Sequence, residues 1–360
     1  MVTTLSKLPP AVDFDNDIAI LKKLGDARDA LAELRGVCTS IPNQAILINT
    51  LSLQEAKDSS AIENIVTTHD DLYRSDLFAQ EFSSPASKEV YNYAEALRYG
   101  YAQVKKSGLL TNNDILSIQR ILEGNDAGFR RIPGTALKND QTGEVVYEPP
   151  QDGRVVLDLM DDLQQFLNQD DICAWHPLIK MAVIHHQFES IHPFYDGNGR
   201  TGRIINILYL VKYGQLNMPV LYLSRYINRT KGDYYRLLQA VRDNEAWRDW
   251  VLYMLTGVEK TAKQTTHLVE GIRDLMRNQK HLIRERCPKI YTQDLLNVLF
   301  SHPYSKIEFL VRELKVTRLT ATSYLNQICD IGLLEKLKIG RSNYYVNKQL
   351  FDLLRNIPDA

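Results

Sequence analysis

The sequence His-Pro-Phe-Tyr-Asp-Gly-Asn-Gly-Arg-Thr-Gly-Arg occupies residues 192–203 and runs directly into the apolar stretch 204–211. That stretch is typical of a buried helix, so the turn at 197–199 would lead the chain into a helix N-terminus. The first turn of a helix has N–H groups without backbone partners, and such groups bind anions. Arg200 and Arg203 lie three residues apart and would share one face beside these groups. This segment therefore predicts a phosphate-binding turn.

Two further residues of the same segment carry chemistry. His192 is a side chain that can accept a proton near neutral pH. Asp196 offers a hard carboxylate oxygen, the type of ligand that Mg²⁺ takes while it also contacts substrate phosphates. Arginine guanidinium groups match phosphate oxygens through paired hydrogen bonds. A base, a metal ligand and a phosphate-binding turn together point to polyphosphate chemistry on a hydroxyl nucleophile.

The segment resembles the signature of the Fic family, His-Pro-Phe-x-Asp-Gly-Asn-Gly-Arg-x-x-Arg, at every fixed position. The resemblance implies transfer of AMP from ATP to a Ser, Thr or Tyr hydroxyl of target proteins and of the chain itself. It implies that His192 is catalytic and that Asp196 holds Mg²⁺. The phosphate-binding residues that it implies are Gly197, Asn198, Gly199, Arg200, Thr201, Gly202 and Arg203.

A second segment, residues 59–64, resembles the inhibitory motif of the same family. Its matching residues are Ser59, Glu63 and Asn64. A Ser followed by Glu is also typical of simple helix capping. On the family interpretation, Glu63 pairs with Arg203 and keeps that arginine from the γ-phosphate of ATP. An alternative role for Glu63 is to orient water for AMP removal, which would make the protein bifunctional.

The segment 132–153 is rich in Pro, Gly and Asn and predicts a β-hairpin. It resembles the family's flap, which pairs with the extended backbone of a target protein. The resemblance implies that Val145, Val146 and Tyr147 dock the target by strand addition. The alternative is an ordinary surface hairpin.

A pair of tyrosines further along the chain resembles the family's adenine pocket. Tyr234, Tyr235 and Leu238 are the residues implied, although tyrosines at helical spacing are also typical of a core. Some relatives carry an asparagine where this chain has Arg242, which leaves the contact to the adenine edge open. His185 and His186 are adjacent, so they would face different ways, and we interpret them as packing residues instead of zinc ligands.

Length and composition limit the class of protein to which these motifs can belong. The chain has 360 residues and a net charge of −1, so no overall charge draws it to nucleic acid or to a membrane. Its four cysteines are scattered and its first residues do not form a signal peptide, which predicts a cytoplasmic protein without a membrane span. A homodimer stays open as an assembly state.

We expect a mainly α protein with a helical Fic fold, a β-hairpin flap and a small C-terminal winged helix-turn-helix domain. The predicted divisions are an N-terminal helical segment (1–87), a catalytic core (88–260), a helical linker (261–288) and the winged-helix domain (289–358). Residues 271–348 contain 14 Lys and Arg against 7 Asp and Glu, a difference of +7. This excess favours DNA as a partner of the last domain, although winged helices also bind proteins. The alternative function is therefore a nucleotide-sensing, DNA-binding regulator.

Overall fold

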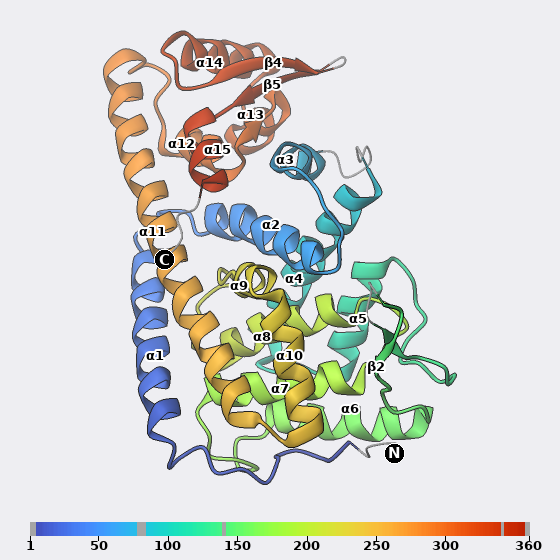
Figure 1. The fold of residues 1–360 in the computed structure, drawn as a ribbon. Coiled ribbons are helices and arrows are strands. Elements are labelled where there is room, and N and C mark those ends of the chain that lie inside the picture. The colour runs from blue at the N-terminus through green and yellow to red at the C-terminus, as the bar shows by residue number, and fades with distance from the viewer. Residues whose placement is uncertain (1–4, 78–83, 139–141, 340–341, 357–360) are drawn as a thin grey trace.

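The computed structural model describes residues 5–77, 84–138, 142–339 and 342–356, and it is mainly helical, as the sequence predicts (Figure 1). The helices as far as the end of the core are α1 (Ile18–Cys38), α2 (Ala45–Ile62), α3 (His69–Leu77), α4 (Pro85–Ser107), α5 (Asn112–Glu123), α6 (Gly153–Asn168), α7 (Pro177–Ile191), α8 (Asn198–Lys212), α9 (Leu223–Arg229), α10 (Lys231–Asn244) and α11 (Trp247–Arg286).

Local sequence explains where the helices beside the 192–203 segment begin and end. The hydroxyl of Thr111 accepts from the N–H of Asp114, whose carboxylate accepts from the N–H of Thr111, so a reciprocal cap starts α5. Gly108 and Gly124 end α4 and α5 at φ of 69° and 67°, a left-handed conformation that glycine adopts without steric cost. These caps fix the two helices that carry part of the site.

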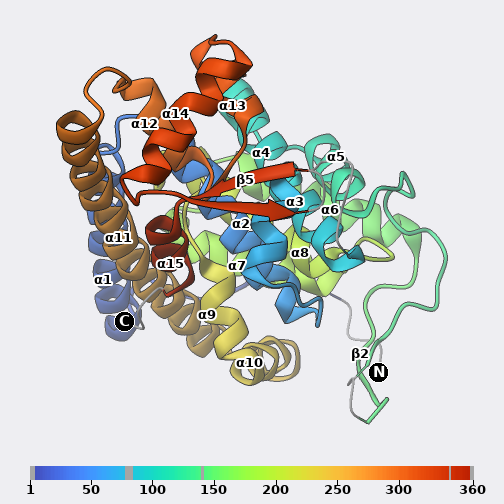
Figure 2. The ribbon, with the colours of Figure 1, turned by 90° about the horizontal axis from the view of Figure 1, so that it is seen from above.

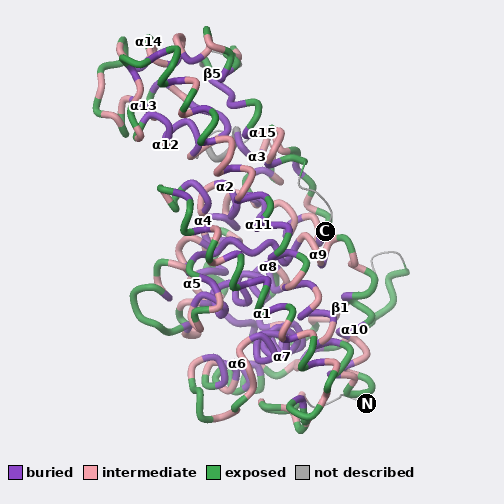
Figure 3. Tube along the Cα trace, turned by 90° about the vertical axis from the view of Figure 1, so that its left-hand side faces the viewer, coloured by how far each residue is buried: buried purple, intermediate pink, exposed green. Residues whose placement is uncertain are grey.

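Helices α7 and α8 form the centre of the molecule and are joined by the segment 192–197. Every residue of α7 from Leu178 to Ile191 is buried, and α7 is an almost continuous buried tube in Figure 3. The indole N–H of Trp250 donates to the carbonyl of Ala182 at 2.8 Å, so α11 is tied to α7. A helix that is buried on all sides belongs to the core, which places the loop after α7 on a rigid support.

Helix α11 joins the core to the C-terminal part of the chain as one continuous helix and lies beside α1 (Figure 1). It buries Leu268, Val269 and Ile272, which lie beyond the boundary predicted at residue 260. The predicted boundaries at 87 and 260 therefore fall inside α4 and α11, and the segment 261–286 continues a helix of the core.

The predicted hairpin is present as two short strands. β1 (Leu137–Lys138) and β2 (Val145–Tyr147) pair antiparallel, and residues 139–141 lie outside the described residues. The hairpin extends from the core beside α6 (Figure 2).

The C-terminal module, as we call residues 289–356, begins with three helices in the predicted order. They are α12 (Gln293–Ser301), α13 (Ile307–Leu314) and α14 (Arg318–Asp330), and the predicted hairpin follows as β4 (Glu335–Ile339) and β5 (Ser342–Val346). The sequence analysis missed β3 (Tyr304–Ser305), which pairs with β5, and α15 (Lys348–Arg355). Among the described residues, no helix is both long and apolar enough to cross a membrane.

Candidate active site

His192 ends α7 and begins the loop that leads to α8. Its backbone is left-handed, with φ of 49°, and its N–H donates to the carbonyl of Phe188 at 2.9 Å. The guanidinium of Arg130 donates to the carbonyls of His192 and Ile191, at 2.7 and 3.1 Å. Arg130 thus caps the end of α7 and holds the strained backbone of His192 in place. Sequence reasoning missed this arginine, which precedes the hairpin.

The imidazole of His192 is held in its neutral form. Burial lowers its pKa to about 4, and the positive charges of Arg242 and Arg130 act in the same direction. Its Nδ1 has no hydrogen-bond partner among the described residues. A neutral imidazole is the form that can accept a proton from a hydroxyl.

The side chain of Asn198 shapes the loop. Its Oδ1 accepts from the N–H of Phe194 and its Nδ2 donates to the carbonyl of Phe194, both at 2.8 Å. Since both side-chain groups are used inside the loop, Asn198 can offer a phosphate its backbone N–H but not its amide. The predicted phosphate contact of Asn198 would therefore be made by its backbone.

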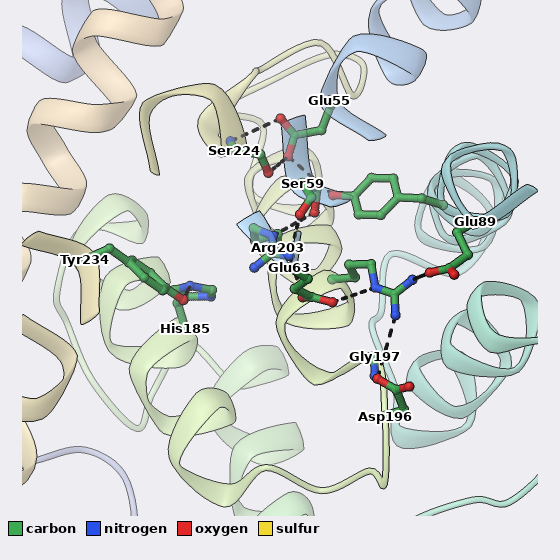
Figure 4. A network of polar contacts seen from close by, with 12 residues as sticks. Glu55, Ser59, Glu63, Glu89, His185, Asp196, Gly197, Arg203, Ser224 and Tyr234 are labelled. Atoms are coloured by element: carbon green, nitrogen blue, oxygen red, sulfur yellow. Dashed lines mark hydrogen bonds and ion pairs between the residues drawn. The ribbon is translucent and has the colours of Figure 1, made fainter. Parts of the chain in front are cut away.

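Arg203 is buried and bound to the predicted inhibitory segment. Its Nε donates to the Ser59 hydroxyl at 2.7 Å, and its Nη2 donates to Glu63 Oε1 at 2.7 Å (Figure 4). Burial acts to lower the pKa of Arg203, but Glu63 and the neighbouring Tyr and Glu side chains together outweigh it, so the pKa is raised. The ion pair between Glu63 and Arg203 that the sequence predicted is therefore present in the structure.

Arg200 is surrounded by carboxylates from three other helices. Its Nε donates to Glu63 at 2.8 Å, its Nη1 to Glu89 at 2.7 Å, and its Nη2 lies 2.9 Å from Glu123. The side chain of Arg200 is only 3% exposed, and Asp196 approaches it to 3.8 Å. Glu63 therefore bridges both arginines, which the sequence did not predict. Glu89 and Glu123 are single acidic residues on α4 and α5, with no local motif that could have identified them.

Carboxylates also lie directly on the turn that was predicted to bind phosphate. A Cβ atom on Gly199 would be 2.5 Å from Glu63 Oε1, and one on Gly197 would be 2.3 Å from Glu123 Oε1. A side chain at either position would have to displace one of these carboxylates, and Gly197 also has a left-handed φ of 78° that favours glycine. The protein's own acidic groups occupy the place where the turn would receive an anion.

Thr201 and Gly202 face the interior, away from this turn. Thr201 is fully buried, its N–H donates to the carbonyl of Gly197, and its hydroxyl has no hydrogen-bond partner among the described residues. A Cβ on Gly202 would lie 2.8 Å from the Glu189 carboxylate, so this glycine serves the packing of α7 on α8. The phosphate contacts of Thr201 and Gly202 stay predictions.

Asn64 allows the chain to turn at the end of the predicted inhibitory segment, residues 59–64. It adopts a left-handed conformation with φ of 62°, which asparagine tolerates better than most residues. The N–H of Ile65 then returns to the carbonyl of Ser60 at 3.0 Å. The chain turns sharply after Glu63, and the carboxylate stays on the arginines. Asn64 therefore has a conformational role beside Glu63.

Two more buried glutamates lie near Arg203 and were missed by the sequence analysis. Burial raises the pKa of Glu55 and of Glu189 to about 7. Glu55 accepts from the hydroxyl of Ser224 and from the N–H of the same residue at 3.2 Å (Figure 4). Because Glu55 lies one turn before Ser59 on α2, this contact also fixes the helix that carries the inhibitory segment.

Asp196 is the predicted metal ligand, and its side chain is 76% exposed. One of its oxygens accepts from the N–H of Gly197 at 2.7 Å, which aims the carboxylate beside the start of α8. Among the described residues, no group of three or more His, Cys, Asp or Glu side chains could hold a metal ion. One exposed carboxylate suits Mg²⁺, which takes its remaining ligands from water and substrate phosphates.

The hairpin residues have two different roles. Val145 and Val146 are exposed, at 57% and 48%, as target-docking residues must be. The hydroxyl of Tyr147 instead donates to the carbonyl of Ser190 at 2.9 Å, and its ring lies 3.8 Å from the Arg242 guanidinium. The side chain of Tyr147 therefore anchors the hairpin to the end of α7, and target docking through its backbone stays a prediction.

The predicted adenine residues do not line one open pocket. Tyr234 is buried and its hydroxyl shares a hydrogen bond of 2.9 Å with His185 Nε2, whereas Tyr235 is 48% exposed. Leu238 is buried, and its carbonyl pairs with His186 Nε2 at 3.2 Å. Tyr234 and Leu238 are core residues, so their assignment to the adenine pocket is corrected. The interpretation of both histidines as packing residues is confirmed.

A cavity of about 320 Å³ lies one to two turns further along α10, beside the hairpin. It is lined by Val241 and Arg242 of α10, by Tyr147, by Trp247 and by the N-terminal segment 5–12. Arg242 lies on the side of this cavity that faces the end of α7, because it donates to the Ser190 hydroxyl and to the carbonyl of Glu189.

Three family models match the chain in sequence order. They are described as Fic/DOC family N-terminal, over residues 21–102, Fic/DOC family, over residues 109–210, and Protein adenylyltransferase SoFic-like, C-terminal domain, over residues 275–350. The middle match contains the whole 192–203 segment. The chain belongs to the Fic/DOC family.

Curated relatives and solved structures agree with this assignment. Protein adenylyltransferase Fic of Drosophila erecta is 28% identical over 173 residues, which are 48% of this chain and 33% of that protein. The relative from Aedes aegypti is 29% identical over 174 residues, with the same coverage. The chain thus matches about a third of the length of these relatives.

The fold is shared with solved Fic proteins. A Fic family protein from Desulfovibrio desulfuricans G20 has a TM-score of 0.58 at 20% identity, covering 94% of this chain and 98% of that one. Fic-1 from C. elegans has a TM-score of 0.53 at 21% identity, covering 71% and 73%. The expected helical Fic fold is confirmed.

Proposed function

We propose that this protein transfers AMP from ATP to a Ser, Thr or Tyr hydroxyl of target proteins and of itself, and that Glu63 inhibits the transfer. The observation that carries the proposal is the grouping of a neutral His192, an exposed Asp196 and two arginines around one helix N-terminus. The relatives named protein adenylyltransferase support the same activity.

The proposed reaction uses His192 as a general base. The neutral imidazole accepts the proton of the target hydroxyl as its oxygen bonds to the α-phosphorus of ATP. The bond between that phosphorus and the pyrophosphate breaks, and pyrophosphate leaves. The proton on His192 then passes to solvent. Val145 and Val146 on the exposed hairpin edge would align the target backbone.

The phosphates would be bound by the turn at the start of α8. The N–H groups of Asn198 and Gly199 and the guanidinium of Arg203 are the donors that the geometry offers. Asp196 would hold Mg²⁺, which neutralises charge on the leaving pyrophosphate when bound.

Glu63 would inhibit this site by occupying both arginines. Its two oxygens each bind a different guanidinium, so a γ-phosphate meets a carboxylate where it needs a free arginine. The ATP would then bind, if at all, with its α-phosphate misaligned. AMP removal remains an alternative, because each oxygen of Glu63 keeps a second lone pair that can accept a hydrogen bond from a water molecule.

DNA binding is a second candidate function, confined to the C-terminal module. Arg318 and Leu319 at the start of α14 are exposed, as are Lys336 and Lys338 on β4. The first residues of such a helix and the lysines of the adjacent hairpin are the groups that would contact a duplex. A purely DNA-binding regulator is disfavoured, because the chain has both His192 and Asp196, the base and the metal ligand of the proposed transfer.

The test compares two labels on ATP. Incubation of the protein and Mg²⁺ with ATP labelled on the α-phosphate should leave label on the protein, whereas a γ-phosphate label should not remain. Retention of the γ label would indicate phosphorylation and contradict AMP transfer. The His192→Ala variant is the control, and label that stays on this variant reports non-enzymatic attachment.

A further inference from the structure

Helix α2, which leads into the inhibitory segment, lies between the core and the C-terminal module (Figures 1 and 3). It packs against α4, α8 and α9 on the core side and against α12 and α3 on the other. Its buried residues are spread over all its faces: Ile46, Leu47, Thr50, Leu51, Ser52, Leu53, Gln54, Glu55, Ala56, Ser59, Ser60 and Ile62. The module therefore forms part of the surface that holds this helix.

Specific contacts join the module to α3. The hydroxyl of Tyr304 on β3 donates to the carboxylate of Asp70. The ring of Phe351 on α15 contacts the rings of Tyr304 and Tyr73 edge-on, with centroids 5.9 and 6.0 Å apart. Tyr73 and Tyr304 are 2% and 3% exposed, so these contacts are out of water and their geometry is restricted.

The same contacts continue into α2. Gln54 Nε2 donates to the hydroxyl of Tyr73 at 2.6 Å, and both side chains are buried. The next residue, Glu55, is bound to Ser224 in α9. Ser59 lies one turn beyond Glu55 and accepts from Arg203. An unbroken set of neighbouring contacts therefore connects Tyr304 of the module to the inhibited arginine.

We propose that docking of the C-terminal module on α3 and α2 holds Glu63 on the arginines, so that a partner which binds and displaces the module relieves inhibition. This inference rests on the proposed function, because it concerns control of the same site. Glu63 directly follows the last residue of α2, and its ion pairs are 2.7 and 2.8 Å long. Hydrogen bonds weaken steeply with distance, so a shift of α2 by about 1 Å would break them.

The test weakens the docking contact without disturbing the active site. Tyr304→Phe and Asp70→Ala each remove the bond between the module and α3 from one side. Each should raise automodification with AMP about 3- to 5-fold, the effect of one lost buried hydrogen bond on the inhibited population. Tyr345→Phe is the matched control, because this buried tyrosine of β5 has its hydroxyl near Asn326 within the module. Its automodification should equal that of the wild type.

A second measurement separates control of Glu63 from a general loss of stability. In the Glu63→Gly background, Tyr304→Phe should have no further effect, because the group that it releases is absent. Amide hydrogen exchange in residues 51–62 should become faster in Tyr304→Phe and stay unchanged in Tyr345→Phe. The inference is overturned if neither docking variant changes automodification, or if the gain is the same with and without Glu63. An inactive Glu63→Gly protein would contradict the proposed function itself.

Discussion

The carboxylate of Glu63 binds Arg203 through one oxygen and Arg200 through the other, at 2.7 and 2.8 Å. The two arginines do not depend on it equally. Arg203 has Glu63 as its only ion-pair partner among the described residues, whereas Arg200 also contacts Glu89 and Glu123. Loss of Glu63 would thus free Arg203 but leave Arg200 paired. Arg203 is therefore the arginine that regulation makes available to a phosphate.

Glu63→Gly should raise automodification about 10-fold, which corresponds to ~1.4 kcal/mol of transition-state stabilisation. The physical reason is that Arg203 becomes free for the γ-phosphate, and a buried charge pair can release at least this much energy. Labelled ATP and Mg²⁺ measure the rate. Adding Arg203→Ala should cancel the gain. If the Glu63→Gly protein is no more active than the wild type, residues 59–64 have a structural role and no inhibitory one.

His192→Ala should abolish AMP transfer and leave ATP affinity within about 2-fold of the wild type, since general bases act on the chemical step and not on phosphate binding. The measurement pairs a transfer assay in the Glu63→Gly background with calorimetric binding of ATP. Near-normal transfer by the alanine variant would remove His192 from the mechanism. A large loss of binding would instead assign it a structural role at the end of α7.

Much of the site could be predicted because it is contiguous in sequence. The segment 192–203 specifies a base, a carboxylate, a glycine turn and two arginines, and the chain between α7 and α8 brings them together. The pair of Glu63 and Arg203 could also be predicted, although the two residues are far apart, because a second motif marks Glu63.

The rest depends on how helices pack, which local patterns do not encode. Glu89, Glu123 and Arg130 are ordinary charged residues in the sequence, and only the packing of their helices or loop places them on Arg200 and on the end of α7. The sequence left Tyr234 open between a ligand pocket and a core, because an aromatic side chain suits both equally well. Its buried hydroxyl partner, His185, decides for the core. The bond between the Tyr147 hydroxyl and the carbonyl of Ser190 likewise depends on packing between the hairpin and α7.

Asp196→Ala should lose the effect of Mg²⁺ on nucleotide affinity as well as AMP transfer, because the exposed carboxylate is the protein's expected link to the metal. Calorimetry with ATP, in Mg²⁺ and in chelator, measures this in the Glu63→Gly background. The parent protein should bind ATP more tightly with Mg²⁺, and the variant should bind it equally in both. Transfer that proceeds in chelator at the full rate would contradict a metal role for Asp196.

If the C-terminal module binds DNA, Lys336→Ala and Lys338→Ala should each weaken binding and reduce the slope of log affinity against log salt by about 1. Both lysines are exposed on β4. Fluorescence anisotropy with a duplex at several salt concentrations provides the slopes. Lys106→Ala, an exposed lysine at the end of α4, is the control and should not change them. No binding to the duplex at low salt would favour a protein partner for the module.

The lowered pKa of His192, about 4, predicts an unusual pH dependence of AMP transfer. A histidine with an ordinary pKa loses its basic form as the pH falls from about 8 to about 6. Here the neutral, active form persists through that window and is lost only as the pH falls through the folded-state value. Transfer by the Glu63→Gly variant should therefore be nearly constant between about pH 8 and about pH 6.

Arg242 provides a test of what lowers the pKa of His192, because its charge is the largest contribution to this shift after burial. Arg242→Gln removes the charge, so the pKa of His192 should rise and the acid limb of the transfer rate should move to higher pH. Arg242→Lys keeps the charge but loses the paired donation to Ser190 and Glu189. If electrostatics sets the pKa, only the glutamine variant shifts the limb. An equal shift in both variants would show that Arg242 acts by positioning the end of α7. An acid limb near pH 6.5 in the parent protein would contradict burial as the factor that controls the pKa of His192.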